Sequence, residues 1–330
     1  MVLRIWLTTL VLGFSTILGV WSCTTPKTSQ TAKLKAKLDK KQKQKVDEYR
    51  AEIEIGRSMS GRLLAFYGVI DDPTLIGYLN QVGTYVASYS EYPDRRYMFQ
   101  ILDNKSVNAF ACPGGYILVT SGAIKAAKNE AELAHILGHE VAHVGEKHMF
   151  DALKGMSKDD MEKAAKEADK ASMRLSEELK VRRRPVPVEN DTGALLAKYL
   201  SGASAGLSIL SAAKAGMSLI LEKGLGADLE YKADEEGTKY AVNAGYEPKA
   251  LMNYLCRIEQ KKRKIKGRCK LSNILKKKRK KRKSIMDKTH PPVGERIANI
   301  TKTLEAIGSL DSIGARGSAR FVKYRKRITN

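Results

Sequence analysis

Apolar residues recur at helical spacing over most of the chain and at strand spacing over one short stretch. Residues 47–66 carry apolar positions that predict a helix, and Asp72-Pro73 predicts an N-cap followed by proline at the first turn of another. Residues 97–102, 107–111 and 116–120 predict three strands joined by turns. We therefore expect an α+β fold that is mostly helical, with one small antiparallel sheet.

The stretch after the third predicted strand carries the chemistry. His139 and His143 are four residues apart, so on a helix they project from one face and can hold one zinc ion from one side. Glu140 can reach a water beside that ion without being a ligand, which suits a general base. The simpler alternative is a surface helix with two exposed histidines.

The same helix has a start signal and a third histidine. Asn129 followed by Glu132 is typical of an N-cap with its capping-box partner. His135 stands four residues before the first histidine of the pair, but a third ligand from one straight helix would lie too far along the axis. We expect His135 to be a polar neighbour at the rim of the site.

A zinc site needs a third protein ligand and an open position for water. Glu230 and Asp234 are four residues apart and would share one helix face. Glu230 can supply the third ligand, and Asp234 can accept a hydrogen bond from the outer nitrogen of a ligating histidine. A solvated acidic helix face is the alternative for this segment.

Five motifs in the same order resemble the zinc metallopeptidases of the HtpX, BepA/LoiP and CAAX prenyl-protease kind. The resemblance covers about residues 47–307 with two interruptions, and it implies a zincin-like (gluzincin) core with the sheet beside the His-Glu-x-x-His helix. It implies one zinc per chain at His139, His143 and Glu230, with Glu140 as base. The motifs are Asn108-Ala-Phe-Ala-Cys-Pro-Gly114-Gly115, His139-Glu-x-x-His143, Glu230-x-x-Ala-Asp234, Asn243-Ala-Gly-Tyr-Glu-Pro248 and Thr289-His-Pro-Pro-x-x-Glu-Arg296.

The resemblance also implies roles for residues outside the ligand set. His290 could be a removable fourth ligand or could stabilise the reaction oxyanion, and Arg296 could assist that oxyanion or clamp the neighbourhood of Glu230. An exposed edge of the small sheet can bind an extended peptide, with Asn108, Gly114 and Gly115 as substrate-binding candidates. The alternatives are a surface histidine, a salt-bridged arginine and ordinary turn chemistry.

The positive charge is concentrated rather than spread. The formal net charge is +23, and residues 257–288 alone hold 17 Lys or Arg against two acidic residues. Such a block favours an anionic partner, and because the N-terminus predicts export we expect lipid phosphates, lipopolysaccharide or acidic substrates rather than nucleic acid. A solvated loop without a partner is weighed equally.

The N-terminus has the pattern of an export signal. An uncharged, mostly apolar run from Ile5 to Trp21 follows Arg4 and is short for a membrane span. Ser22-Cys23 then resembles a bacterial lipobox, with Cys23 as the lipidated residue, and an uncleaved anchor is the alternative. Either pattern places the chain on the periplasmic side of the envelope, and Thr24 favours the outer membrane.

The resulting division has a signal peptide at 1–22, a Lys-rich tether at 23–46 and a metallopeptidase domain at 47–307. Insertions are expected at about 150–192, as a charged solvated helix or lid, and at 257–288, where Cys256 and Cys269 could pair or stay free. Residues 194–221 favour buried helices, and 308–330 a mobile basic tail.

These features predict a zinc metalloendopeptidase of the bacterial periplasm that degrades misfolded or stalled envelope proteins. Two alternatives stay open. One is a chaperone or assembly factor with a largely latent zinc site, and the other is a basic interaction protein on anionic membrane surfaces.

Overall fold

The computed structural model describes residues 27–179, 209–265 and 289–328. The predicted signal peptide, Cys23, and most of the basic stretch 257–288 lie outside these residues. The chain divides into two units between residues 45 and 46. Helix α1 (Lys27–Tyr67) begins in the predicted tether, where residues 31–45 are helical and exposed. Within the described residues, no helix has both the length and the apolar character needed to cross a membrane.

The sheet has three strands in the order β1-β3-β2, namely β1 (Met98–Leu102), β2 (Ala109–Cys112) and β3 (Tyr116–Thr120). A tight turn, η1 (Pro113–Gly115), makes β2 and β3 an antiparallel hairpin, but β1 pairs with β3 in parallel. The expected all-antiparallel sheet is therefore wrong for β1. The reason lies in the β1–β2 connection, which crosses the end of β3 and bonds there: Asn104 O accepts from Gly122 N, and Ser106 O accepts from Thr120 Oγ1.

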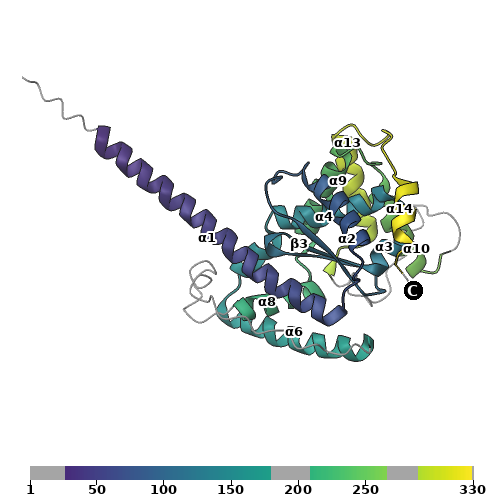
Figure 1. The fold of residues 1–330 in the computed structure, drawn as a ribbon, viewed down its shortest axis with the longest axis horizontal. Helices are drawn as coiled ribbons and strands as arrows, with labels where there is room; N and C mark the ends of the chain where they lie inside the picture. Colours follow the sequence, from purple (N-terminus) through teal and green to yellow (C-terminus); the bar gives the residue numbers. More distant parts are fainter. Residues whose placement is uncertain (1–26, 180–208, 266–288, 329–330) are drawn as a thin grey trace, which may run out of the picture. The chain divides into compact units, whose positions relative to one another are not determined.

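Two apolar clusters lie on opposite faces of this sheet, because side chains alternate along a strand. Ile117 and Val119 belong to one cluster, and Leu118 between them belongs to the other. The first cluster is covered by α2 (Pro73–Ala87), α3 (Ser121–Ala126), α4 (Glu130–Gly145), α9 (Ala227–Asn243), α10 (Ala250–Lys262), α13 (Val293–Ala306) and α14 (Ser318–Arg325). The second is covered by the last part of α1, α5 (His148–Lys154), α6 (Lys158–Leu179), α8 (Ile209–Ser218) and the π-helical turn η2 (Leu219–Lys223) (Figure 1).

The helix expected over the charged stretch near 157–178 exists as α6, but it is not solvated all round. Met161, Ala164 and Ala168 are buried, and the helix packs along α8. The buried helices expected in 194–221 are confirmed for residues 209–221, and residues 194–208 lie outside the described part of the chain. Helices α6 and α8 therefore bury each other's small apolar residues.

The C-terminal stretch predicted to be a mobile tail is instead a docked helix, α14. Phe321 is fully buried, and Arg320 reaches the buried Glu130 at the start of α4, whose carboxylate also accepts hydrogen bonds from two tyrosines. The prediction of a mobile tail was wrong because one of the basic residues, Arg320, pairs with a buried carboxylate. Among the cysteines, Cys256 is disulfide-bonded, Cys112 is a buried free thiol, and Cys269 lies outside the described residues.

Candidate metal centre

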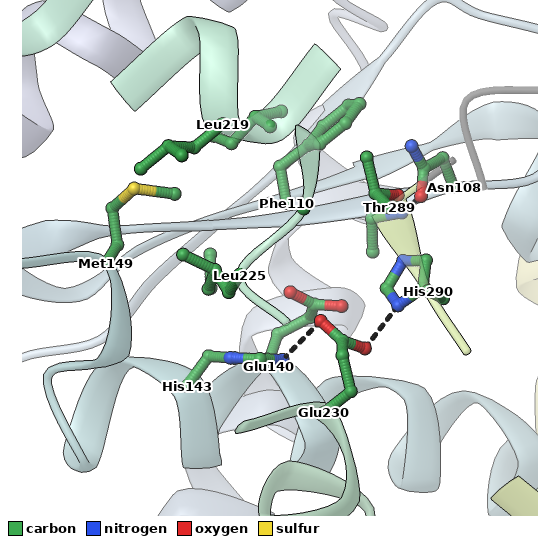
Figure 2. Close-up of a pocket in the computed structure, with 14 residues that line it drawn as sticks. Asn108, Phe110, Glu140, His143, Met149, Leu219, Leu225, Glu230, Thr289 and His290 are labelled. Carbon is green, nitrogen blue, oxygen red and sulfur yellow. Dashed lines mark hydrogen bonds and ion pairs between the residues drawn. The ribbon is translucent and has the colours of Figure 1, made fainter. Parts of the chain in front are cut away.

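Three side chains from two helices converge on one point. His139 Nε2 lies 3.2 Å from His143 Nε2, and the Glu230 carboxylate lies 3.5 Å from the first and 3.4 Å from the second. Ligand atoms held ~2.0–2.2 Å from a tetrahedral ion are about 3.4 Å from one another. The three groups therefore have the chemistry and the mutual spacing that a zinc ion requires, and all three are buried. Figure 2 shows two of them, His143 and Glu230, side by side.

The two helices reach this distance because glycines stand where they cross. A Cβ on Gly138 of α4 would lie 2.6 Å from the Gly237 carbonyl oxygen of α9. Gly138 directly precedes His139 in α4, and Gly237 follows Glu230 and Asp234 in α9. The close approach of the two backbones therefore brings both carboxylates to the histidine pair.

His139 is held from its outer side by a buried carboxylate. Its Nδ1 lies 3.0 Å from Asp234 Oδ1, and Arg296 forms a bidentate pair with Asp234 at 2.6 and 2.8 Å. With Nδ1–H donated to Asp234, Nε2 faces the site with its lone pair. Of the two roles suggested for Arg296, the geometry favours the clamp, since two of its nitrogens are committed to Asp234.

His143 is held in the same way by a residue that the sequence analysis did not single out. His148 Nδ1 lies 2.9 Å from His143 Nδ1, and the His148 ring is buried. The chain reaches this position by a sharp reversal, because Lys147 has a left-handed φ of 56° between α4 and α5. The only signal available in the sequence was a fourth histidine, five residues after His143.

Two more predicted residues line the site. Glu140 faces the pocket beside the Glu230 carboxylate, and His290 hydrogen-bonds Glu230 through Nδ1 (Figure 2). His290, His139 and Glu230 also form a group whose ligand atoms lie within 4.8 Å of one another. His290 therefore lies within reach of the Glu230 carboxylate, as expected for a candidate fourth ligand.

The charges in the site support one another. Burial alone would raise the pKa of Glu230, but His290, His143 and His139 around it hold that pKa well below its ordinary value. Burial would likewise raise the pKa of Asp234, and Arg296 lowers it. Burial also lowers the pKa of His148, to about 3, so this ring stays neutral and can accept the hydrogen bond from His143.

The three substrate-binding candidates do not lie together. Asn108 lines the pocket beside Glu140. Gly114 and Gly115 instead lie where the chain passes close to other backbone. A Cβ on Gly114 would lie 2.6 Å from Ile53 Cα, and a Cβ on Gly115 would lie 1.9 Å from the Arg96 carbonyl oxygen. Their positive φ angles of 72° and 105° also favour glycine.

The expected place of His135 at the rim of the site is wrong. His135 is fully buried, and its Nε2 donates to the Glu247 carbonyl oxygen at 3.0 Å. The start signal of its helix is confirmed, since the Asn129 side chain accepts from Glu132 N at 2.9 Å. Glu132 reaches back one residue further than a capping box requires, to Lys128 N, and also binds Arg257.

The fold and this site define a metallopeptidase. Residues 73–304 match the family model described as peptidase family M48, and the chain belongs to that family. The resemblance found in the motifs is thereby confirmed at the level of the family.

Curated relatives match over part of their length. A beta-barrel assembly-enhancing protease of Escherichia coli is 24% identical over 207 residues, covering 62% of this chain and 37% of that protein. The protein of the same name from Yersinia pestis is 26% identical over 213 residues, covering 64% and 38%. Mitochondrial metalloendopeptidase OMA1 of Schizosaccharomyces pombe is 29% identical over 116 residues, covering 35% and 32%. The match thus covers only about a third of the length of each of these relatives.

Proposed function

We propose that this chain is a zinc-dependent endopeptidase in which His139, His143 and Glu230 hold one zinc ion. The observation that carries the proposal is the spacing of 3.2–3.5 Å among the two imidazole nitrogens and the carboxylate. Zinc bound there would supply a Lewis acid that lowers the pKa of water to about 7.

The remaining steps belong to the residues around the ligands. Glu140 takes the proton of the attacking water and passes it to the leaving amine, since its carboxylate faces the pocket. Asp234 and His148 orient the two histidines. His290 stands close enough to the ligands to stabilise the developing oxyanion once it separates from Glu230.

The substrate is proposed to be an extended polypeptide. β2 lies at the edge of the sheet, next to the pocket that Asn108 and Glu140 line, so a peptide can add to this edge by backbone pairing. Gly114 and Gly115 would support such a binding track from the far end of β2, where they pack against other backbone, without contacting the peptide themselves.

We place the enzyme on the periplasmic side of a bacterial envelope, anchored through Cys23 and degrading misfolded or stalled envelope proteins. The support is the apolar N-terminal run and the similarity to relatives named beta-barrel assembly-enhancing protease. Residues 257–288 would then contact anionic lipid or lipopolysaccharide, and no nucleic-acid partner is proposed.

One observation favours a second candidate, an assembly factor whose peptidase site is mostly latent. His290 bonds to Glu230, which ties up a carboxylate that the zinc site needs. Such a protein would act chiefly by docking unfolded chains. Its signature would be that a Glu140→Gln variant complements most of a deletion phenotype.

The deciding experiment combines zinc analysis with degradation of unfolded outer-membrane proteins. Wild-type protein should hold one zinc per chain and cleave these proteins. Glu140→Gln should keep the zinc and lose cleavage. Cleavage by that variant at close to the wild-type rate would exclude the proposed mechanism, and an absence of zinc from the folded wild type would exclude the site.

A further inference from the structure

Two pockets meet at Glu140, and both are apolar beyond the meeting point. They share four lining residues, which are Asn108, Ala109, Glu140 and His290. The first pocket extends past His143 to Phe110, Met149, Leu219, Ile220 and Leu225. Phe110, Met149, Leu219 and Leu225 lie across it from the Glu230 carboxylate (Figure 2). The second extends past His139 to Val107, Ala123, Ile136, Leu251, Tyr254 and Leu255.

The two pockets lie on opposite faces of the sheet. Phe110, Met149 and Leu219 belong to the apolar cluster shared with α1, α6 and α8. Ile136, Leu251 and Tyr254 belong to the cluster on the other face, shared with α4 and α10. The shared residues Asn108 and Ala109 stand at the start of β2, on the edge between the two faces.

This placement matches the geometry of an extended peptide. Successive side chains of a strand point to opposite faces of the sheet. A peptide lying along the β2 edge with one peptide bond over Glu140 would therefore send the side chain on one side of that bond into the first pocket. The side chain on the other side of the bond would enter the second pocket.

The first pocket is a built feature rather than a gap between helices. Its wall comes from η2, where the helix widens into a π-turn that ends at Gly224 with a φ of 74°. A Cβ on Gly224 would lie 2.4 Å from the Thr289 carbonyl oxygen. This glycine therefore lets the apolar wall and the His290 loop close on each other from opposite sides of the pocket.

We propose that the peptidase cleaves between two apolar residues, each held in one of these pockets. The proposal rests on the proposed function and names its substrate class: segments with adjacent large apolar side chains. Such segments are buried in folded proteins and become accessible when a chain is unfolded. The enzyme would thus distinguish unfolded from folded proteins by the side chains that it binds on either side of the cleaved bond.

The test uses the full chain loaded with zinc and a series of peptides around one cleavable bond. The two flanking residues are Leu-Leu, Leu-Asp, Asp-Leu, Gly-Leu and Leu-Gly. Placing Asp or Gly on either side should lower kcat/KM at least tenfold relative to Leu-Leu, since the loss of even one methylene group from an apolar pocket lowers kcat/KM by about 10–200-fold. Cleavage-site mapping on a urea-unfolded protein should show apolar residues enriched on both sides.

Two variants then assign the pockets. Leu225→Trp narrows the first and Val107→Trp the second, at positions that are partly exposed. Each should shift the preference toward Gly or Ala on one side of the bond, and the two should act on opposite sides. Ile313→Trp, at a side chain that is 94% exposed, is the control that should change neither.

Failure of the two-pocket proposal and failure of the proposed peptidase function would give different results. Cleavage of all five peptides at similar kcat/KM would overturn the two-pocket proposal while leaving the peptidase intact. Both variants acting on the same side would overturn it too. If wild type with bound zinc cleaved none of the peptides and no unfolded protein, the proposed function would fall, and the pocket assignment with it.

Discussion

Gly138 of α4 and Gly237 of α9 meet backbone to backbone where the two site helices cross. A Cβ on Gly237 would lie 2.5 Å from the His139 backbone nitrogen, and real Cβ atoms do not come that close. Because His139 and Glu230 stand on either side of this crossing, the distance between the helix axes also sets the distance between the ligands.

Replacing Gly237 with alanine should therefore lower both stability and zinc affinity. Helix propensity alone favours alanine over glycine by about 1 kcal/mol. The overlap with α4 should outweigh this gain and cost about 1–3 kcal/mol in the free energy of unfolding. Urea unfolding and competition with a zinc chelator measure the two effects.

The matched control is Gly77→Ala, since Gly77 is an exposed residue of helix α2 with open space around its Cβ position. That change should stabilise the protein by about 0.5–1 kcal/mol. A Gly237→Ala protein as stable as the Gly77→Ala protein would show that the crossing tolerates a methyl group and that these glycines do not set the distance between the ligands.

His148 should matter to zinc without touching it. In His148→Phe, the Nδ1–H of His143 loses its acceptor, and the ring is free to take the other tautomer or rotate. We expect a 10–100-fold increase in the zinc dissociation constant. His148→Gln keeps an acceptor and should recover part of the loss. Equal zinc affinity in all three proteins, at equal thermal stability, would reduce His148 to a packing residue.

Arg296 and Asp234 should be strongly coupled in stability. Arg296→Met leaves a buried carboxylate with the His139 ring alone, which should cost about 3–5 kcal/mol. Adding Asp234→Asn removes the unpaired charge, so the double variant should be more stable than Arg296→Met alone. Unfolding curves of the two single variants and the double variant give the coupling energy, and simple additivity would contradict the ion pair.

The sequence predicted the parts of the site that depend on local spacing. His139, Glu140 and His143 follow from the spacing on one helix, Glu230 was a candidate because it shares a helix face with Asp234, and the family resemblance then implied it as the third ligand. His148 could not be found in this way, because its contact depends on the left-handed turn at Lys147. A sequence motif indicates which residues share a helix face. It does not indicate the direction in which the chain enters the next helix.

The fold shows the same limit at a larger scale. Strand positions were predicted within two residues, but β1 was expected to be antiparallel. Whether the chain folds back or crosses over between β1 and β2 depends on the bonds that Asn104 and Ser106 form with residues 14–18 positions later. The docking of α14 likewise depends on Arg320 meeting Glu130, 190 residues away in the sequence. Pairings of this kind have no local signal.

His135 should make stability depend on pH in the acidic range. Burial lowers its pKa to about 4, against an ordinary value of 6.5, with the bond to Glu247 O opposing the shift in part. Since the folded pKa is the lower one, the unfolded chain binds a proton first as pH falls. The contribution of the neutral His135 ring to the free energy of unfolding is fully present above pH 6.5 and is lost as the pH falls from 6.5 to 4. Its full size is on the order of 3 kcal/mol.

The variant that isolates this effect is His135→Gln, which can still donate to the Glu247 carbonyl but does not titrate. Unfolding free energies of both proteins should be measured at pH 7.5 and pH 4.5 with excess chelator, so that loss of metal is common to all four measurements. Every other titrating group is also common to the pair. The wild type should therefore lose more stability than the variant on acidification, by up to the full contribution of His135, and an equal loss in the two proteins would mean that His135 does not titrate below its ordinary pKa.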